Sequence, residues 1–435
     1  MNDGALVAIA VLLFAWAVVS ARLGRLGVTA PLTFVIAGFV LARTGSIEVT
    51  ANSASVRHVA EAALVLLVFS DASRVDTGSV RTEGGMWLRL LGLGVPLALL
   101  AGTGLALLCF PGLGIWPAIL VAACLTPTDA GLASDVISNP AMPPRVARAL
   151  NVESGVNDGL IAPVVVLAIA GAAEAQANAS GFVVTAAEEL SKGAVSGLIA
   201  GAICATIVVF TLRRGWLAEE ADAIAVIAVP GVAYLSALAI HGNGFVAAFL
   251  AGLVFGRARR TLGPASFEFT EQAGQVLAMF VWFVLGAALL RPAFDHADWR
   301  VVLYALLLLT AARMIPVALS LLGTRADWAT VLFMGWFGPR GLASLVFGLL
   351  ALDELGPEGA SVMVAISITV LASVVLHGFT AGPLVRRYRR HLDGLAADHP
   401  TLAEAEAPTG RRPLGVNRHT QGGSKHDGHS PRARR

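Results

Sequence analysis

Two short polar stretches interrupt long apolar runs of this chain, and both carry side chains that could bind a cation. The first, TPTDA, holds Asp129, and the second, ESGVNDG, holds Glu153 and Asp158. Successive residues of a helix are about 100° apart, so Glu153 and Asp158 lie about 140° apart and face different neighbours. Because these two carboxylates are not placed to share a proton, we expect them to do different work.

The helix face of Asp158 offers oxygen ligands. Ser154 lies one turn before Asp158 and shares its face. Asp129 and the backbone carbonyl of Thr128 would complete a cage of oxygens if the preceding helix were broken. Such a cage suits a hard cation, and without histidine or cysteine it does not indicate a transition metal. A carboxylate removed from water also takes up a proton readily, so a cation and a proton would compete for Asp158, which is the chemistry of antiport.

Glu153 needs a partner of opposite charge, because an isolated charge in a membrane interior costs several kcal/mol. Two arginines lie in apolar stretches, Arg313 in LLTAARMIPV and Arg340 in GWFGPRGLASL. We expect Glu153 to pair with at least one of them as a structural tie, and the sequence leaves both pairings open. Asn157, one turn after Glu153, shares its face.

Composition assigns the whole chain to the polytopic membrane proteins. Hydrophobic residues make up 56% of it and charged residues only 14%, whereas soluble domains carry roughly 25% charged residues. There is no phosphate-binding loop of the form G-x-x-x-x-G-K-[ST], which disfavours an ATP-driven pump. We also find no loop that resembles the selectivity filter of a cation channel.

The pattern of apolar residues predicts thirteen helical spans, since a membrane helix needs roughly 20 mostly apolar residues. The expected spans are approximately 4–21, 29–44, 58–73, 86–110, 115–136, 147–172, 190–213, 222–240, 243–257, 272–290, 299–323, 328–351 and 361–386.

The loops predict the orientation of the chain in the cell membrane. Loops after odd-numbered spans carry arginines, from Arg22 and Arg25 to Arg386 and Arg387, whereas PGLGIWP, HGNG and LDELGPEGA carry no lysine or arginine. The positive-inside bias therefore places the N-terminus outside and the C-terminus in the cytoplasm, in an inner membrane if the cell has two. Residues 392–435 have few large apolar side chains, and we expect them to form a disordered basic cytoplasmic tail.

Two of the expected spans should be interrupted. Pro127 breaks the backbone hydrogen bonding of the fifth, and the glycines and proline of GWFGPRG do the same in the twelfth. Spans seven apart run in opposite directions, and interrupted helices in matching places of two halves indicate an inverted-repeat transporter. Asp129 would suit the positive N-terminal helix ends at such a crossing, and Arg340 the negative C-terminal ends.

The combination of TPTDA, VESGVNDG, GNGFVAAFLAGLVFG and GWFGPRGLASL resembles the NhaP-type branch of the monovalent cation:proton antiporters, the sodium/proton exchanger family. The resemblance covers about residues 5–388. It implies an all-α, NhaA-like fold of inverted repeats with two broken crossing helices in a transmembrane domain of residues 1–391. It also implies a homodimer, with core spans at about 86–172 and 299–388 that move like an elevator against dimerisation spans at about 4–73 and 190–290.

The resemblance also implies roles for single residues. Asp158 resembles the family's ion- and proton-binding aspartate, and Ser154, Asp129 and the Thr128 carbonyl resemble its other ion ligands. Asn157 resembles the asparagine that steadies the crossing of the broken helices.

Glu153, with Arg313 or Arg340, resembles the family's buried ion pair. The electrogenic relatives have aspartate at the position of Asn157, so the resemblance implies electroneutral exchange of one cation for one proton. Asp129 stands as a second group that could titrate.

The sequence therefore predicts an antiporter rather than an enzyme, exchanging Na⁺ for H⁺, with Li⁺ as a surrogate. A K⁺/H⁺ antiporter on the same scaffold and a cation or pH sensor without flux are the alternatives. We expect no cofactor and no nucleic acid, and as partners only monovalent cations, protons, membrane lipids and a second copy of the chain.

Overall fold

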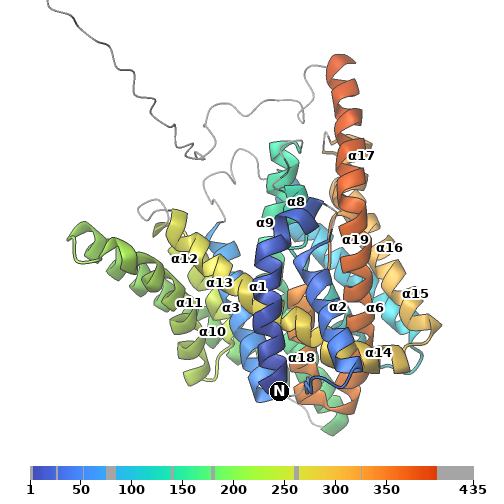
Figure 1. Ribbon diagram of the computed structural model, residues 1–435, viewed down its shortest axis with the longest axis horizontal. Coiled ribbons are helices and arrows are strands. Elements are labelled where there is room, and N and C mark those ends of the chain that lie inside the picture. The colour runs from blue at the N-terminus through green and yellow to red at the C-terminus, as the bar shows by residue number, and fades with distance from the viewer. Residues whose placement is uncertain are drawn as a thin grey trace, which may run out of the picture.

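The computed structural model describes residues 3–398, apart from 26–27, 52, 75–84, 138, 140–141, 178–181, 259–263 and 325. Every regular element among these residues is a helix. Figure 1 shows the helices as a bundle, with the first residues of α1 at one end of the molecule. The last 37 residues of the predicted tail, 399–435, lie outside the described residues.

The helices are mostly long rods, several of them divided by an irregular or π-helical segment. In chain order they are α1 (Asp3–Arg25), α2 (Ala30–Arg43), α3 (Ala54–Ser73), α5 (Gly85–Arg89), the π-helical η1 (Leu90–Gly94), α6 (Val95–Cys109), α7 (Ile115–Leu125), α8 (Ser134–Ile137), α9 (Pro144–Ala177), α10 (Phe182–Arg213), the short 3₁₀ turn η2 (Glu219–Ala221), α11 (Asp222–Ala239), α12 (Gly244–Phe255), α13 (Pro264–Val284), the π-helical η4 (Leu285–Leu289), α14 (Leu290–His296), α15 (Trp299–Leu309), α16 (Ala311–Ser320), α17 (Trp328–Trp336), α18 (Leu342–Leu355) and α19 (Pro357–Asp398).

Eight helical stretches of the described residues are long and apolar enough to cross a membrane. Three shorter apolar helices, α2, α7 and α12, add to these. The chain is therefore a multi-pass membrane protein, as its composition predicts, and the count of thirteen spans stays a prediction.

The two predicted interruptions are present. The first runs from Thr126 to Ala133, between α7 and α8, and the second from Phe337 to Gly341, between α17 and α18. The two irregular segments touch, because the backbone N–H of Asp129 donates to the carbonyl of Pro339 at 2.8 Å. This contact is the crossing on which the rest of the site is built.

Small residues let two helices approach closely on one side of the bundle. Gly193, Gly197 and Gly201 recur every four residues along α10, and a Cβ on any of them would collide with the backbone of α12 or of Asn243 just before it. Close packing of backbones through small residues is a common way to join helices where lipid removes the hydrophobic driving force.

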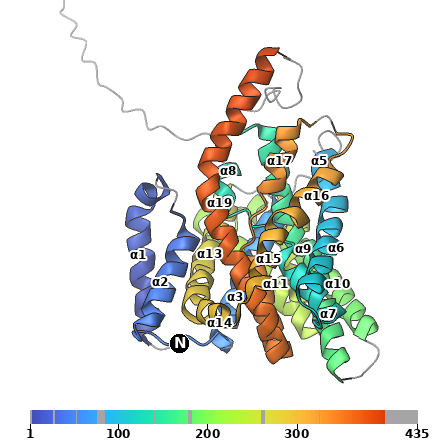
Figure 2. The same ribbon diagram turned by 90° about the vertical axis from the view of Figure 1, so that its right-hand side faces the viewer.

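The last helix corrects one expectation. α19 continues to Asp398, so residues 392–398 are helical and do not belong to a disordered tail. Arg389 and Asp393 form an exposed pair at 2.9 Å one turn apart on α19. His391 Nε2 lies 2.8 Å from Asp327 at the start of α17, and this contact ties the polar extension to a neighbouring helix. Figure 2 shows this end of α19 projecting past its neighbours, at the opposite end of the molecule from the N-terminus.

A cluster of polar contacts joins three helices at the same end of the molecule as the N-terminus. Arg57, in the first turn of α3, forms an ion pair with Asp353, near the end of α18. Arg57 Nε also lies 3.6 Å from Glu61, which accepts a hydrogen bond from Tyr234 of α11 at 3.2 Å. Asp71 follows Arg57 on the same helix by fourteen residues, or about 21 Å at 1.5 Å per residue.

Candidate cation site at the helix crossing

A cavity of about 550 Å³ lies beside the crossing. One wall is formed by the first irregular segment and by α9, which contribute Thr128, Asp129, Ser154 and Asp158. The facing wall comes from α1, α2, α3 and α13. Its lining includes residues near the last turns of α1 and α3 and the early turns of α13, so the cavity extends toward the face at which α1 and α3 end.

Thr128 links the crossing to α9. Its Oγ1 lies 2.8 Å from Ser154 Oγ, and it accepts a hydrogen bond from Asn157 Nδ2 at 2.8 Å. Asn157 is fully buried. The side chains of Asn157 and Ser154 thus both contact Thr128 Oγ1 and join the irregular segment to α9.

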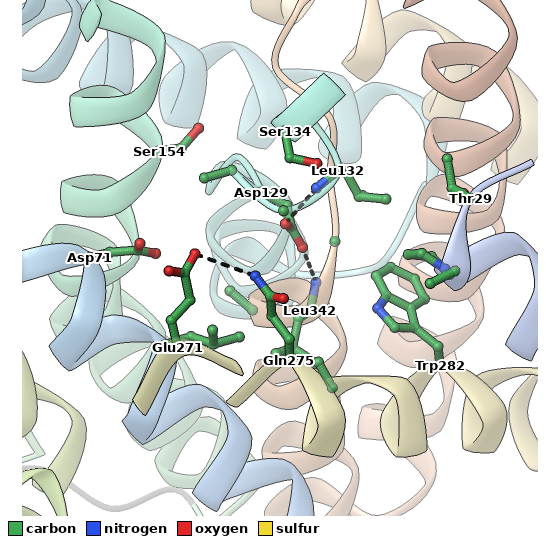
Figure 3. Close-up of a pocket in the computed structure, with 18 of the residues that line it drawn as sticks. Thr29, Asp71, Asp129, Leu132, Ser134, Ser154, Glu271, Gln275, Trp282 and Leu342 are labelled. Atoms are coloured by element: carbon green, nitrogen blue, oxygen red, sulfur yellow. Dashed lines mark hydrogen bonds between the residues drawn. The ribbon is translucent and has the colours of Figure 1, made fainter. Parts of the chain in front are cut away.

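Asp129 accepts hydrogen bonds from the N-terminus of one helix and from the turn that precedes another. Its Oδ2 accepts from Leu342 N at 2.8 Å, at the start of α18, and its Oδ1 accepts from Leu132 N at 3.0 Å, just before α8 (Figure 3). Free N–H groups at a helix N-terminus favour a negative charge. Gly341 is required here, because a Cβ at that position would overlap the Asp129 carboxylate.

Arg340 lies at the C-terminal helix end of the crossing, where the free groups are carbonyls. Its Nη1 donates to the carbonyls of Thr126 at 2.6 Å and Pro127 at 3.1 Å, which follow the end of α7. The residue is 2% exposed. A guanidinium thus satisfies carbonyls that lack helical partners, as expected from the charge at a helix C-terminus.

The partner of Glu153 is Arg313 of α16. The two Nη groups of Arg313 donate to the two carboxylate oxygens of Glu153, the Nη2–Oε2 contact at 2.9 Å. Their side chains are 3% and 1% exposed. Of the two pairings that the sequence leaves open, the structure has this one, and Arg340 is the arginine that serves the helix-end carbonyls.

The second break is tied to α19. The backbone N–H of Arg340 donates to Ser373 Oγ at 2.7 Å, and His377 Nε2 lies 2.9 Å from the carbonyl of Trp336, the last residue of α17. His377 also stacks on the Trp336 ring. Through these contacts, α19 helps to hold the backbone of the second irregular segment, and so the base of the Arg340 side chain, in place.

Asp158 differs from the other charged residues of the site. Its Oδ1 is buried and has no hydrogen-bond partner within the described part of the chain. The carbonyl of Thr128 likewise accepts no hydrogen bond there. A carboxylate oxygen and a carbonyl oxygen that line a cavity without protein donors are the groups from which a hard cation takes its ligands.

Sequence reasoning missed Asp71 of α3, which lines the same cavity. Its Cβ lies 3.0 Å from the position that a Cβ on Gly155 would take, so α3 and α9 are in close contact beside Ser154. Asp71 interacts electrostatically with Asp129, and Asp158 with both of these carboxylates. An acidic residue inside an apolar span is itself a signal of function, and this signal could have identified Asp71.

The described residues contain no group of three or more His, Cys, Asp or Glu side chains arranged to hold a metal ion. The oxygens near the crossing belong instead to the carboxylates of Asp129 and Asp158, the hydroxyls of Thr128 and Ser154, and the carbonyl of Thr128. This mixed, weakly charged set is a poorer match to a tightly bound transition metal than to a hard cation that binds and leaves.

Comparison with known proteins points the same way. A family model described as sodium/hydrogen exchanger, transmembrane, matches residues 9–387. A probable Na⁺/H⁺ antiporter of Schizosaccharomyces pombe is 27% identical over 68% of this chain and 41% of its own length. The K⁺/H⁺ antiporter NhaP of Alkalimonas amylolytica is 25% identical over 83% of this chain and 63% of its own. The chain thus spans less than two thirds of either relative.

The fold has a counterpart among solved structures. The sodium proton antiporter MjNhaP1 from Methanocaldococcus jannaschii superposes with a TM-score of 0.70 over 88% of this chain and 98% of that one, at 19% sequence identity. The NhaA-like antiporter fold expected from the sequence is therefore the fold of this chain.

Proposed function

Because the chain belongs to the sodium/hydrogen exchanger family, we propose that it is a secondary antiporter that exchanges Na⁺ for H⁺ at the helix crossing. Na⁺ and H⁺ compete for Asp158, and Ser154, Asp129 and the Thr128 carbonyl supply further oxygens. Li⁺ acts as a surrogate for Na⁺. Exchange needs no ATP and no cofactor, since the opposing gradient drives each ion.

The free oxygen of Asp158 carries this proposal. Either ion can satisfy it without breaking a protein contact, because the buried Oδ1 has no hydrogen bond among the described residues. A cation restores the charge balance through a metal–oxygen contact, and a proton does so by a covalent O–H bond. Only a loaded site would be able to change sides, since moving an uncompensated carboxylate through the membrane interior is costly.

The bonding of Asp129 supports a stoichiometry of one cation to one proton. Both of its oxygens accept from backbone N–H groups, which favour the charged carboxylate, so a proton placed there would weaken those bonds. Asp158 gains a proton with no such loss. One freely exchanging carboxylate trades one charge, and the exchange is electroneutral.

Alternating access would follow from motion of the helices that carry the crossing. The core of spans 86–172 and 299–388 moves against spans 4–73 and 190–290, which also form a homodimer. The cavity lies between these two sets and opens to the cytoplasm in the orientation that places the N-terminus outside. The protein resides in the cell membrane, the inner one where there are two.

K⁺/H⁺ exchange is the second candidate, because the relatives include antiporters named for each ion. The mechanism through Asp158 is the same in both cases. A cation or pH sensor without flux is the remaining alternative, and a transport measurement separates it from both.

The test is reconstitution in liposomes that contain a pH dye. A pH gradient is imposed, the voltage is clamped with an ionophore, and Na⁺, Li⁺ or K⁺ is added in turn. We expect Na⁺ and Li⁺ to dissipate the gradient at a rate that is independent of voltage, and Asp158→Asn to abolish this response.

Asp295→Asn is the matched control. Asp295 lies on α14, its side chain is 64% exposed, and it does not line the cavity. Exchange that persists in Asp158→Asn would refute the role of that carboxylate. A response to K⁺ alone would change the substrate and keep the mechanism, and no response to any cation would favour the sensor.

A further inference from the structure

The cavity lining contains a single positively charged side chain, Arg74, among the residues that the structure describes. It stands among four acidic residues, Asp71, Asp129, Asp158 and Glu271. A fixed guanidinium in a pocket that must receive small cations is a competitor for the same carboxylates. The way in which the protein controls Arg74 therefore bears directly on cation binding.

Arg74 is bound to Glu271. The guanidinium, just after the last turn of α3, forms an ion pair with the Glu271 carboxylate of α13. The other oxygen of Glu271 accepts from Gln275, one turn later on α13, at 3.3 Å. Figure 3 shows Glu271 and Gln275 joined on one side of the pocket, with Asp71 beside Glu271. Glu271 is thus held in place by a neighbour and holds Arg74 in turn.

Asp71 is the alternative partner of Arg74. It precedes Arg74 by three residues, and residues three apart on a helix are neighbours on its surface. The two interact electrostatically. No hydrogen bond or ion pair to the Asp71 carboxylate is present within the described residues, so it is free to receive a cation. A guanidinium that turned from Glu271 to Asp71 would cover this carboxylate.

We infer that Glu271 is a positioning residue for cation exchange: it holds Arg74 away from Asp71, and so keeps the Asp71 carboxylate open to the entering cation. The inference rests on the proposed function and concerns how the same site stays accessible. Glu271 acts through Arg74 and does not itself need to touch the transported ion.

Tethering makes the competition strong. Arg74 is attached to the helix that carries Asp71, so its local concentration near that carboxylate is on the order of millimolar or higher. Its planar donors also fit a carboxylate better than a spherical monovalent ion does. Without Glu271, the guanidinium would act as an internal inhibitor that external cations must displace.

The test is a double-mutant cycle on the apparent KM for Na⁺ in proteoliposomes. Glu271→Gln preserves shape and removes the charge that holds Arg74. We expect its KM to rise about tenfold, the equivalent of one hydrogen bond to a charged group, with little change in the maximal rate at saturating Na⁺. Arg74→Gln, added to Glu271→Gln, should return the KM to within about threefold of the wild type, because the competitor is gone.

Two controls separate positioning from folding. If the double variant has a lower KM than Glu271→Gln alone, lost stability cannot explain the effect of the single substitution. In an Asp71→Asn background, Glu271→Gln should change the KM by less than twofold, because Arg74 then has no carboxylate to cover. Gln275→Ala should give a smaller rise in KM than Glu271→Gln, since it only loosens Glu271.

The outcomes distinguish the inference from the function on which it rests. Wild-type exchange with an unchanged KM in Glu271→Gln overturns the inference alone. A double variant that is no better than Glu271→Gln does the same, since Arg74 would then not be the cause. The absence of cation-dependent proton flux in the wild type overturns the proposed function, and the inference with it.

Discussion

Replacing Arg313 with alanine tests the buried ion pair most directly. The substitution leaves the Glu153 carboxylate, 1% exposed, without its two guanidinium contacts. Removing one partner of a buried pair costs about 3–5 kcal/mol, because the other charge stays buried and uncompensated. A large domain loses about 2 °C in melting temperature per kcal/mol, so we expect a fall of about 6–10 °C.

The matched comparison removes both charges. In a variant with Glu153→Leu and Arg313→Met, no charge is left buried, and apolar side chains of similar volume fill the space. Replacement of a buried ion pair in this way is often neutral or stabilising. We therefore expect the double variant to melt within about 2 °C of the wild type or above it.

Thermal unfolding of the purified protein, followed by loss of monodispersity in one detergent, measures both. Arg389→Ala serves as the control, because its pair with Asp393 is exposed and should contribute little. If the double variant melts as low as Arg313→Ala, packing around the Arg313 side chain, and not an unpaired carboxylate, determines the loss, and the reasoning is refuted.

Three substitutions at the crossing extend these tests. Gly341→Ala places a Cβ where the Asp129 carboxylate lies, so we expect exchange to fall at least tenfold while the protein still inserts, and flux at wild-type level would contradict the fit. Arg340→Met strips the donor from the carbonyls of Thr126 and Pro127 and should lower the melting temperature by about 4 °C or more. Asp129→Asn turns one acceptor into a donor facing a backbone N–H, and should raise the KM for Na⁺ about tenfold, as dye-based flux measures.

The breaks and the crossing were predictable because their causes are local. Pro127 and the glycines around Pro339 act on their own backbone, and a carboxylate or guanidinium at a helix end follows from the charge of that end. The expected partners of Asp129 and Arg340, the N-terminal and C-terminal helix ends, are those that the structure shows.

The choice between Arg313 and Arg340 for Glu153 depended on long-range packing. α15 and α16 are separated at Thr310, where the backbone turns to φ −111° and ψ −88°, and this kink has no proline at that residue to signal it. Arg313 reaches Glu153 of α9 from the helix that follows this break, and so from a direction set by the packing of the helices. The periodicity of apolar residues contains no such direction.

Asp71 and Glu271 escaped prediction for a related reason. The two residues lie in different helices, 200 positions apart in sequence, and neither forms a motif by itself. Their significance comes from the packing of α3 against both α9 and α13, which brings them to one cavity. The helical end of α19 was missed because its stabilising contact, His391 with Asp327, is also distant in sequence.

The ion pair between Arg57 and Asp353 has a practical consequence for every flux measurement. It joins α3 to α18 on the face opposite the cavity opening, and both side chains are about one-third exposed. Exposed pairs weaken as the Debye length shrinks, from about 10 Å at 0.1 M salt to about 3 Å at 1 M. A sodium titration without a compensating inert salt therefore weakens this ion pair while Na⁺ fills the site. A KM measured in that way combines cation binding with the effect of ionic strength on the protein. Titration at constant ionic strength, with choline replacing sodium, keeps them apart.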